Sequence, residues 1–183
     1  MDNGESSYRR FLDGDPSGFD ELVVMYREPL ILFINGFLHN LAESEDVAEE
    51  AFMELIVHPK RYSFRSSLKT YLFSVAKNKA VDRVRREMKF SSYITPEDCE
   101  KEDGVRVEEY IFRKENENML SRAMEKIHPE YAAVLRLIYL EDMTGEEAGK
   151  VLGKNKRQMA NLLYRAKNSL RRAMEEEGFI YEK

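Results

Sequence analysis

The chain has 183 residues, 43% of them hydrophobic and 34% charged, with a formal net charge of −5, so it can form helical cores in one domain or in two small ones. It has no apolar run long enough to span a membrane and its start lacks the apolar segment of a secretory signal, so we expect a cytoplasmic protein with no membrane insertion. A single cysteine excludes an internal disulfide, the histidines lack zinc-ligand spacing, and the common phosphate-binding and hydrolase motifs are absent. We therefore expect no catalytic residues, no metal and no cofactor.

Three amphipathic helices are predicted in the acidic segment 1–60, which carries thirteen Asp/Glu and four Lys/Arg. The first begins near Phe19, the second can start at Pro29, and the third is capped by Ser44 and ends before His58. Their apolar residues recur at helical spacing. We expect the three helices to share a core with the helix that follows them.

An aromatic, serine-containing loop followed by one long helix is predicted for residues 62–87. Ser66 or Ser67 can cap the helix, and apolar residues recur at every fourth position from Leu68 to Met88. A second stripe, turned away from this ridge, consists of two cations with a ring between them: Lys69, Phe73 and Lys77.

Residues 61–90 carry nine Lys/Arg and two Asp/Glu, which gives +7 in a chain of net charge −5. Cations can follow phosphates and rings can stack on unpaired bases, so this pattern suits a single-stranded nucleic acid. A solvated helix with ordinary positive charge is the alternative. The candidate DNA-binding residues of this block are Tyr62, Phe64, Arg65, Lys69, Tyr71, Phe73, Lys77 and Arg83.

Residues 91–114 are acidic, contain Pro96 and Gly104 and lose the helical periodicity, so they are predicted to be a linker. The linker separates two predicted domains, residues 1–90 and 115–183.

Two capping boxes follow in the second domain. Thr144 with Glu147 opens a short helix that stops at Gly153, and Asn155 with Gln158 opens a long one. Helix, glycine-containing turn and helix predict a helix-turn-helix. Residues 154–172 carry seven Lys/Arg and no acid, although a solvated face is again the alternative. The candidate DNA-binding residues are Lys156, Arg157, Gln158, Asn161, Tyr164 and Arg165.

Four segments in order resemble the bacterial sigma factors of RNA polymerase, specifically the small two-domain extracytoplasmic-function group. They are FDELVVMYREPL, SEDVAEEAFMELI, YSFRSSLKTYLFSVAKNKAVDRVRR, and IHPEYAAVLRLIYLEDMTGEEAGKVLG followed by YRAKNSLRR. The resemblance implies that the third segment melts and reads the minus-ten promoter element and that the fourth reads the minus-thirty-five element. It also implies three partners, namely core RNA polymerase, promoter DNA and an anti-sigma factor.

By the same resemblance, the second segment is the helix that docks on the coiled coil of the largest polymerase subunit. Its candidate partner-binding residues are Asp46, Val47, Glu49 and Glu50; Phe52 also matches, but a core position suits it better. The chain departs from the family at Tyr71, where a tryptophan is usual, and in the run from Arg157 to Leu162, which replaces Gly-Thr-Val-Lys-Ser-Arg. No promoter sequence can therefore be carried over.

The sequence thus predicts an all-α protein of two small helical domains joined by an acidic linker, acting as a transcription initiation factor and not as an enzyme. A helix-turn-helix repressor that acts without polymerase is the main alternative. A metal-dependent nuclease that uses carboxylates near the basic helix is the other.

Overall fold

The computed structural model describes residues 4–91 and 115–179, and every regular element within these ranges is helical. The chain divides into two compact units, Met1–Gly104 and Val105–Lys183, which confirms an all-α protein with two helical domains. The predicted linker lies outside the described residues apart from Ser91, and its boundaries stay a prediction. The elements are α1 (Glu5–Leu12), α2 (Ser17–Leu38), α3 (Leu41–Val57), the 3₁₀ turn η1 (Pro59–Arg61), α4 (Leu68–Ser91), α5 (Glu115–Lys126), α6 (Pro129–Leu135), the π-helical turn η3 (Arg136–Leu140), α7 (Gly145–Leu152) and α8 (Lys156–Glu176).

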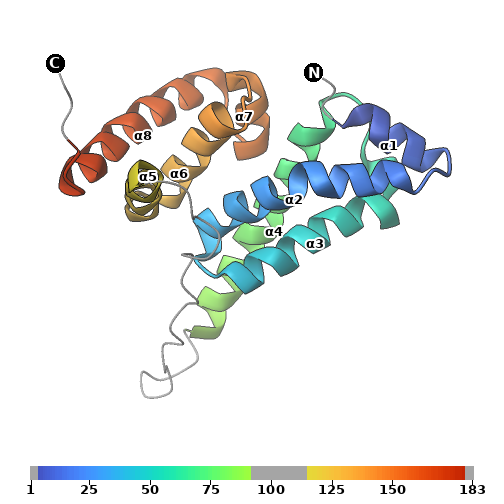
Figure 1. Ribbon diagram of the computed structural model, residues 1–183, viewed down its shortest axis with the longest axis horizontal. Helices are drawn as coiled ribbons and strands as arrows, with labels where there is room; N and C mark the ends of the chain where they lie inside the picture. The colour runs from blue at the N-terminus through green and yellow to red at the C-terminus, as the bar shows by residue number, and fades with distance from the viewer. Residues whose placement is uncertain (1–3, 92–114, 180–183) are drawn as a thin grey trace. The chain divides into compact units, whose positions relative to one another are not determined.

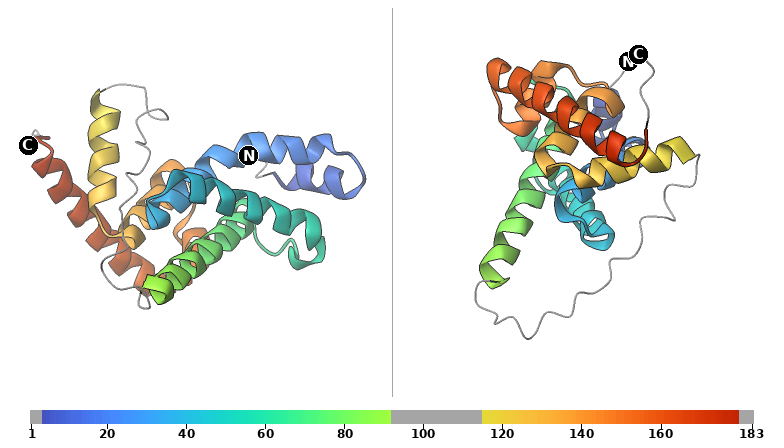
Figure 2. Two further views of the ribbon diagram at one scale, coloured as in Figure 1. Left: turned by 90° about the horizontal axis from the view of Figure 1, so that it is seen from below. Right: turned by 90° about the vertical axis from the view of Figure 1, so that its left-hand side faces the viewer.

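In the first unit α2, α3 and α4 pack alongside one another, and α1 folds back beside the start of α2 (Figures 1 and 2). The apolar faces predicted from the sequence supply the core. Each large aliphatic side chain that leaves water contributes about 1.5–3 kcal/mol, so this core fixes how α3 and α4 are presented. Its buried members include Leu22, Leu30, Ile34, Val47, Ala51, Leu55, Leu68, Leu72 and Ala76.

Pro29 lies inside α2 and does not start a new helix, so the prediction of two helices between residues 19 and 38 is wrong. Proline within a helix costs about 3 kcal/mol, because a hydrogen bond is lost and the ring crowds the preceding turn. Buried side chains on both sides of the proline, among them Tyr26 and Leu30, offset this cost. The apolar stripe therefore continues through Pro29 as one helix.

Helix α1 was not predicted from the sequence. It packs so closely on α2 that a Cβ atom added at Gly18 would lie 2.2 Å from the backbone oxygen of Ser7. The Tyr8 hydroxyl, fully buried, donates a 2.8 Å hydrogen bond to the carbonyl of Leu55 at the end of α3. Burial raises the pKa of Tyr8 to about 12. Helix α1 is therefore part of the first unit's core.

The start of α3 differs from the prediction, because Asn40 and not Ser44 caps it. The Asn40 side chain accepts a hydrogen bond from the Glu43 backbone N–H at 3.2 Å. Ser44 is buried one turn into the helix, and its hydroxyl donates to the carbonyl of Asn40 at 2.6 Å. For α4 the prediction holds, since Ser67 Oγ accepts from the Thr70 backbone N–H at 3.2 Å.

The second unit contains the predicted helix-turn-helix in α7 and α8. Both capping boxes form, Thr144 with Glu147 and Asn155 with Gln158, and Gly153 ends α7 with a left-handed φ of 67°. Within the second unit α8 also packs against α6 and α5 (Figure 2). The exposed face of α8 is thus held on a helical support.

Candidate functional site

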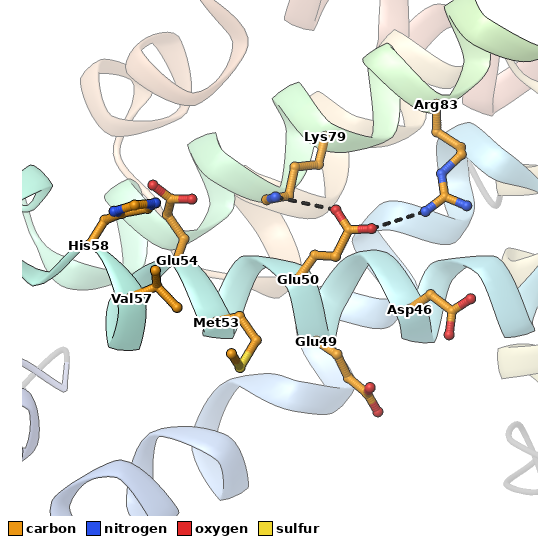
Figure 3. A pocket seen from close by; sticks show the side chains of 9 residues that line it. All are labelled: Asp46, Glu49, Glu50, Met53, Glu54, Val57, His58, Lys79 and Arg83. Carbon is orange, nitrogen blue, oxygen red and sulfur yellow. Dashed lines mark hydrogen bonds and ion pairs between the residues drawn. The ribbon is translucent and has the colours of Figure 1, made fainter.

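A groove runs between α3 and α4 in the first unit, and Glu50 lies at its centre (Figure 3). The Glu50 carboxylate accepts hydrogen bonds from Lys79 Nζ at 3.2 Å and from Arg83 Nη2 at 3.1 Å. All three side chains are part-exposed, at 48%, 30% and 31% of their full area. A carboxylate predicted to bind polymerase is therefore paired with a cation, Arg83, predicted to bind DNA.

The other acidic candidates of α3 face outward. Asp46 and Glu49 are exposed, and within residues 4–91 neither forms an ion pair (Figure 3). Exposed apolar side chains continue the same helical face one and two turns later: Met53 at 50%, Ile56 at 40% and Val57 at 57% exposure. The outward face of α3 thus joins carboxylates to an apolar patch.

Val47 does not belong to this face. Its side chain is fully buried in the core, so its assignment as a partner contact is wrong. Adjacent residues of a helix point about 100° apart, and that angle separates Val47 from Asp46. Phe52 is also buried, as expected for a core residue.

The predicted aromatic loop before α4 turns its rings inward. Tyr62 is only 3% exposed, and its hydroxyl lies 2.8 Å from the Ser66 carbonyl and 3.2 Å from a carboxylate oxygen of Glu5. Burial, and next to it the charge of Glu5, raise the pKa of Tyr62. Tyr62 therefore does not present its ring to solvent in this conformation, and its assignment as a DNA contact stays a prediction.

Phe64 and Arg65 differ from each other in the same loop. Phe64 is half-buried, with its ring centroid 4.5 Å from that of Tyr62, whereas Arg65 is exposed. Tyr71, on the first turns of α4, is half-buried and its ring lies 5.2 Å from Tyr62. Burial raises the pKa of Tyr71 as well.

The stripe of two cations and a ring on α4 is only partly present. Phe73 is completely buried, with its ring centroid 5.2 Å from that of Phe33 on α2, so the prediction of a DNA-facing ring is wrong. Lys69 and Lys77 are half-buried at the edge of the helix. Phe73 lies on a different face of α4 from the Leu68 ridge. Helix α2 covers that face as well, because α4 packs against both α2 and α3.

On α8 all six candidate DNA-binding residues are exposed, from Lys156 to Arg165. Tyr164 is 71% exposed. The Gln158 side-chain oxygen accepts from the Asn155 backbone N–H at 2.9 Å, which leaves the amide N–H₂ group of Gln158 for an outside partner. The buried side of the helix consists of Met159, Leu162, Ala166 and Ala173.

Sequence reasoning missed Lys79, Glu5 and Arg9. In the sequence Lys79 is only one of the nine Lys/Arg of residues 61–90, because no local signal places it opposite Glu50. Glu5 and Arg9 contact the loop before α4 from the unpredicted helix α1. Their sequence separation from that loop exceeds fifty residues, so no local pattern reveals the contacts.

Residues 4–91 and 115–179 contain neither a cluster of His, Cys, Asp or Glu placed to hold a metal ion nor a helix long and apolar enough to span a membrane.

Known proteins share both units. Residues 22–90 match the family Sigma-70 region 2, and residues 117–170 match Sigma-70, region 4. The chain is 25% identical to the ECF RNA polymerase sigma factor SigW of Bacillus subtilis (strain 168) over 171 residues, which cover 88% of this chain and 91% of that protein. It is 26% identical to the RNA polymerase sigma-H factor of Pseudomonas aeruginosa over 173 residues, which cover 88% and 89%.

Solved structures share the fold. The sigma factor RpoE in complex with the anti-sigma factor NepR, from Bartonella quintana, superimposes with a TM-score of 0.64 at 16% identity, covering 86% of this chain and 96% of that one. CnrH in complex with the cytosolic domain of CnrY gives a TM-score of 0.67 at 17% identity, covering 96% and 99%.

Proposed function

Since the chain belongs to the extracytoplasmic-function group of RNA polymerase sigma factors, and is thus a transcription initiation factor that directs polymerase to promoters, we propose which surfaces carry out each step. The outward face of α3 binds core polymerase. The loop before α4 and the cations of α4 hold melted minus-ten DNA, and the exposed face of α8 contacts upstream duplex.

The observation that carries the polymerase assignment is the outward face of α3. Asp46 and Glu49 lie beside the exposed apolar side chains of Met53, Ile56 and Val57 on one side of the helix. Contiguous apolar area with a charged border is typical of a protein-binding surface. Acidic side chains around it favour a partner of opposite charge and increase the association rate.

The DNA assignment rests on exposure and charge. Helix α8 presents its candidate residues to solvent, and no acidic residue occurs between Lys154 and Arg172. Its first turns can reach base edges and later cations can reach phosphates. In the first unit, Arg65, Lys69 and Lys77 remain as the contacts nearest the loop.

Further parts of the proposal concern the chain as a whole. The domains comprise residues 1–90 and 115–183, with 91–114 as the linker. The protein acts in the cytoplasm and performs no catalysis of its own. Because RpoE was solved with the anti-sigma factor NepR, and CnrH with the cytosolic domain of CnrY, we include an anti-sigma partner for this chain.

The test compares two valines changed to the same acidic residue. Val57→Glu places a charge in the apolar patch of α3, whereas Val24→Glu changes a valine on α2 that is 87% exposed. Loss of a central apolar contact with burial of a new charge should weaken binding to immobilised core polymerase about tenfold or more for Val57→Glu. Val24→Glu should bind like the unchanged chain. Equal affinity of both variants would remove α3 from the polymerase interface.

A further inference from the structure

The loop before α4 contains a strained residue. Phe64 has a φ of 59°, in the left-handed region that bulky side chains rarely adopt. Such a conformation persists only where surrounding contacts impose it, and it is concentrated at functional sites. Contacts around Phe64 therefore hold it in this conformation.

Helix α1 supplies those contacts. The Arg9 guanidinium carbon lies 4.1 Å above the centroid of the Phe64 ring, a close cation–π distance. The Tyr8 ring lies 6.3 Å from Phe64 and 5.8 Å from Tyr62. Glu5 accepts from the Tyr62 hydroxyl. Three residues within about one turn of α1, namely Glu5, Tyr8 and Arg9, thus fix both rings of the loop.

Fixing these rings determines what the loop presents to solvent. Tyr62 is buried and Phe64 half-buried, whereas Ser63 and Arg65 are exposed. Inward and outward residues alternate from 62 to 65, and the left-handed backbone of Phe64 sets where Arg65 points. The rings therefore act as anchors, while Ser63 and Arg65 form the outward surface.

We propose that Arg9 is a positioning residue for capture of the melted strand: by clamping the Phe64 ring, it holds the loop so that Ser63 and Arg65 face that strand. The proposal rests on the proposed function of this loop and adds a role for α1, which precedes the segment matched to Sigma-70 region 2. A loop already held in its binding conformation loses less entropy when it takes up single-stranded DNA. Arg9 acts through Phe64 and does not itself contact the DNA.

Arg10 provides a matched control on the same helix. It is exposed like Arg9, but it pairs with Asp15 at 3.3 Å and with Glu21 at 2.7 Å, away from the loop. Arg10→Ala thus removes the same charge from α1 without touching Phe64.

The experiment uses reconstituted holoenzyme and a promoter that the unchanged holoenzyme transcribes, prepared with a pre-melted minus-ten region. Arg9→Ala should weaken binding to this DNA about fivefold, the factor given by a cation–π contact of about 1 kcal/mol. Arg9→Lys, which keeps the cation, should recover much of the loss, and Arg10→Ala should bind normally. Core affinity should be unchanged in Arg9→Ala, because Arg9 lies on α1 and not on the outward face of α3. The thermal midpoint should fall by only a few degrees, because a single contact of an exposed side chain is lost.

A second background separates positioning from direct contact. Glycine adopts a positive φ freely, so Phe64→Gly removes both the strain and the ring that Arg9 clamps. In that background Arg9→Ala should have no further effect on binding. A fivefold loss that persists there, or an equal loss from Arg10→Ala, overturns the proposal, because Arg9 would then act through its charge on the DNA.

One more variant tests the proposed function independently. Lys69→Ala combined with Lys77→Ala should weaken binding to the pre-melted promoter if α4 holds the strand. Unchanged binding of this double variant contradicts the α4 assignment itself. Weakened binding of the double variant together with normal binding of Arg9→Ala contradicts only the role of Arg9.

Discussion

Glu50 and Asp46 lie one turn apart on α3, yet we expect charge reversal at the two positions to have different consequences. Asp46 is exposed and forms no ion pair within residues 4–91. Glu50 joins α3 to α4 through Lys79 at 3.2 Å and Arg83 at 3.1 Å. Glu50→Lys would place three cations together in the groove of Figure 3.

The magnitude follows from the exposure of these groups. A part-exposed ion pair contributes about 0–1 kcal/mol, so the loss of both pairs and the new repulsion should lower the free energy of unfolding by about 1–2 kcal/mol. That corresponds to a fall in melting temperature of roughly 4–15 °C for a unit of this size. Asp46→Lys should stay within about 0.5 kcal/mol of the unchanged chain, because no pair is broken.

Urea unfolding at low and high salt is the appropriate assay, because it reports the free energy of unfolding directly. The destabilisation by Glu50→Lys should shrink in about 1 M salt, where the Debye length is about 3 Å. Adding Lys79→Glu to Glu50→Lys should restore part of the stability, since one pair is rebuilt with its charges exchanged. Equal unfolding free energies for Glu50→Lys and Asp46→Lys would refute the reasoning, and so would a loss that salt does not affect.

The remaining predictions concern α8, the helix-turn-helix and the buried tyrosines. Arg157→Ala with Asn161→Ala should reduce transcription about tenfold or more at promoters that need upstream contacts and should remove the upstream footprint, because a good base contact is worth about 1–3 kcal/mol; an intact footprint would mean that α8 does not read DNA. Gly149→Ala should destabilise the second unit by about 1–3 kcal/mol in urea unfolding, since its Cβ would lie 2.9 Å from a backbone oxygen of the following turn, whereas Gly145→Ala meets nothing within 4 Å and serves as the control. Burial raises the pKa of Tyr8 to about 12, above the value of about 10 in an unfolded chain, so its stabilisation is complete below about pH 10 and is lost as the pH rises towards about 12. Urea unfolding across this range should show a shallower decline in Tyr8→Phe, and identical slopes would contradict the buried hydroxyl.

Local signals made the helix-turn-helix predictable from sequence. Thr144 with Glu147 and Asn155 with Gln158 are pairs three residues apart, and each pair forms the capping box that its spacing predicts. The cap of α4 at Ser67 was predictable for the same reason. Interactions within one helical turn depend little on the rest of the fold.

Non-local packing explains what sequence reasoning missed. The helical rotation of about 100° per residue places Phe73 on a different face of α4 from the Leu68 ridge. It does not reveal that α2 covers the face bearing Phe73. Tyr62 is buried because α1 packs over the loop, and α1 itself gave no recognised signal. The pairing of Glu50 with Lys79 joins residues 29 positions apart, so charge counts alone could not find it.

We expect this chain to read promoters only as a subunit of polymerase, because of the way its charge is distributed. Acidic segments adjoin the basic block at residues 61–90, and the whole chain carries a formal net charge of −5, so the free protein is repelled by DNA at long range. Opening the duplex also costs about 1–2 kcal/mol for each base-pair step. Two modest basic surfaces do not bind tightly enough to offset the free energy of opening the duplex. Polymerase holds both surfaces at high local concentration next to the DNA and adds its own DNA contacts.

The most direct measurement is the affinity for promoter duplex and for the non-template single strand, with and without core enzyme, across a salt series. We predict weak binding by the isolated chain at physiological salt, and tight binding that appears only with core enzyme and weakens in the Lys69→Ala, Lys77→Ala double variant. Tight, sequence-specific duplex binding by the isolated chain would contradict it and would favour a repressor that acts without polymerase.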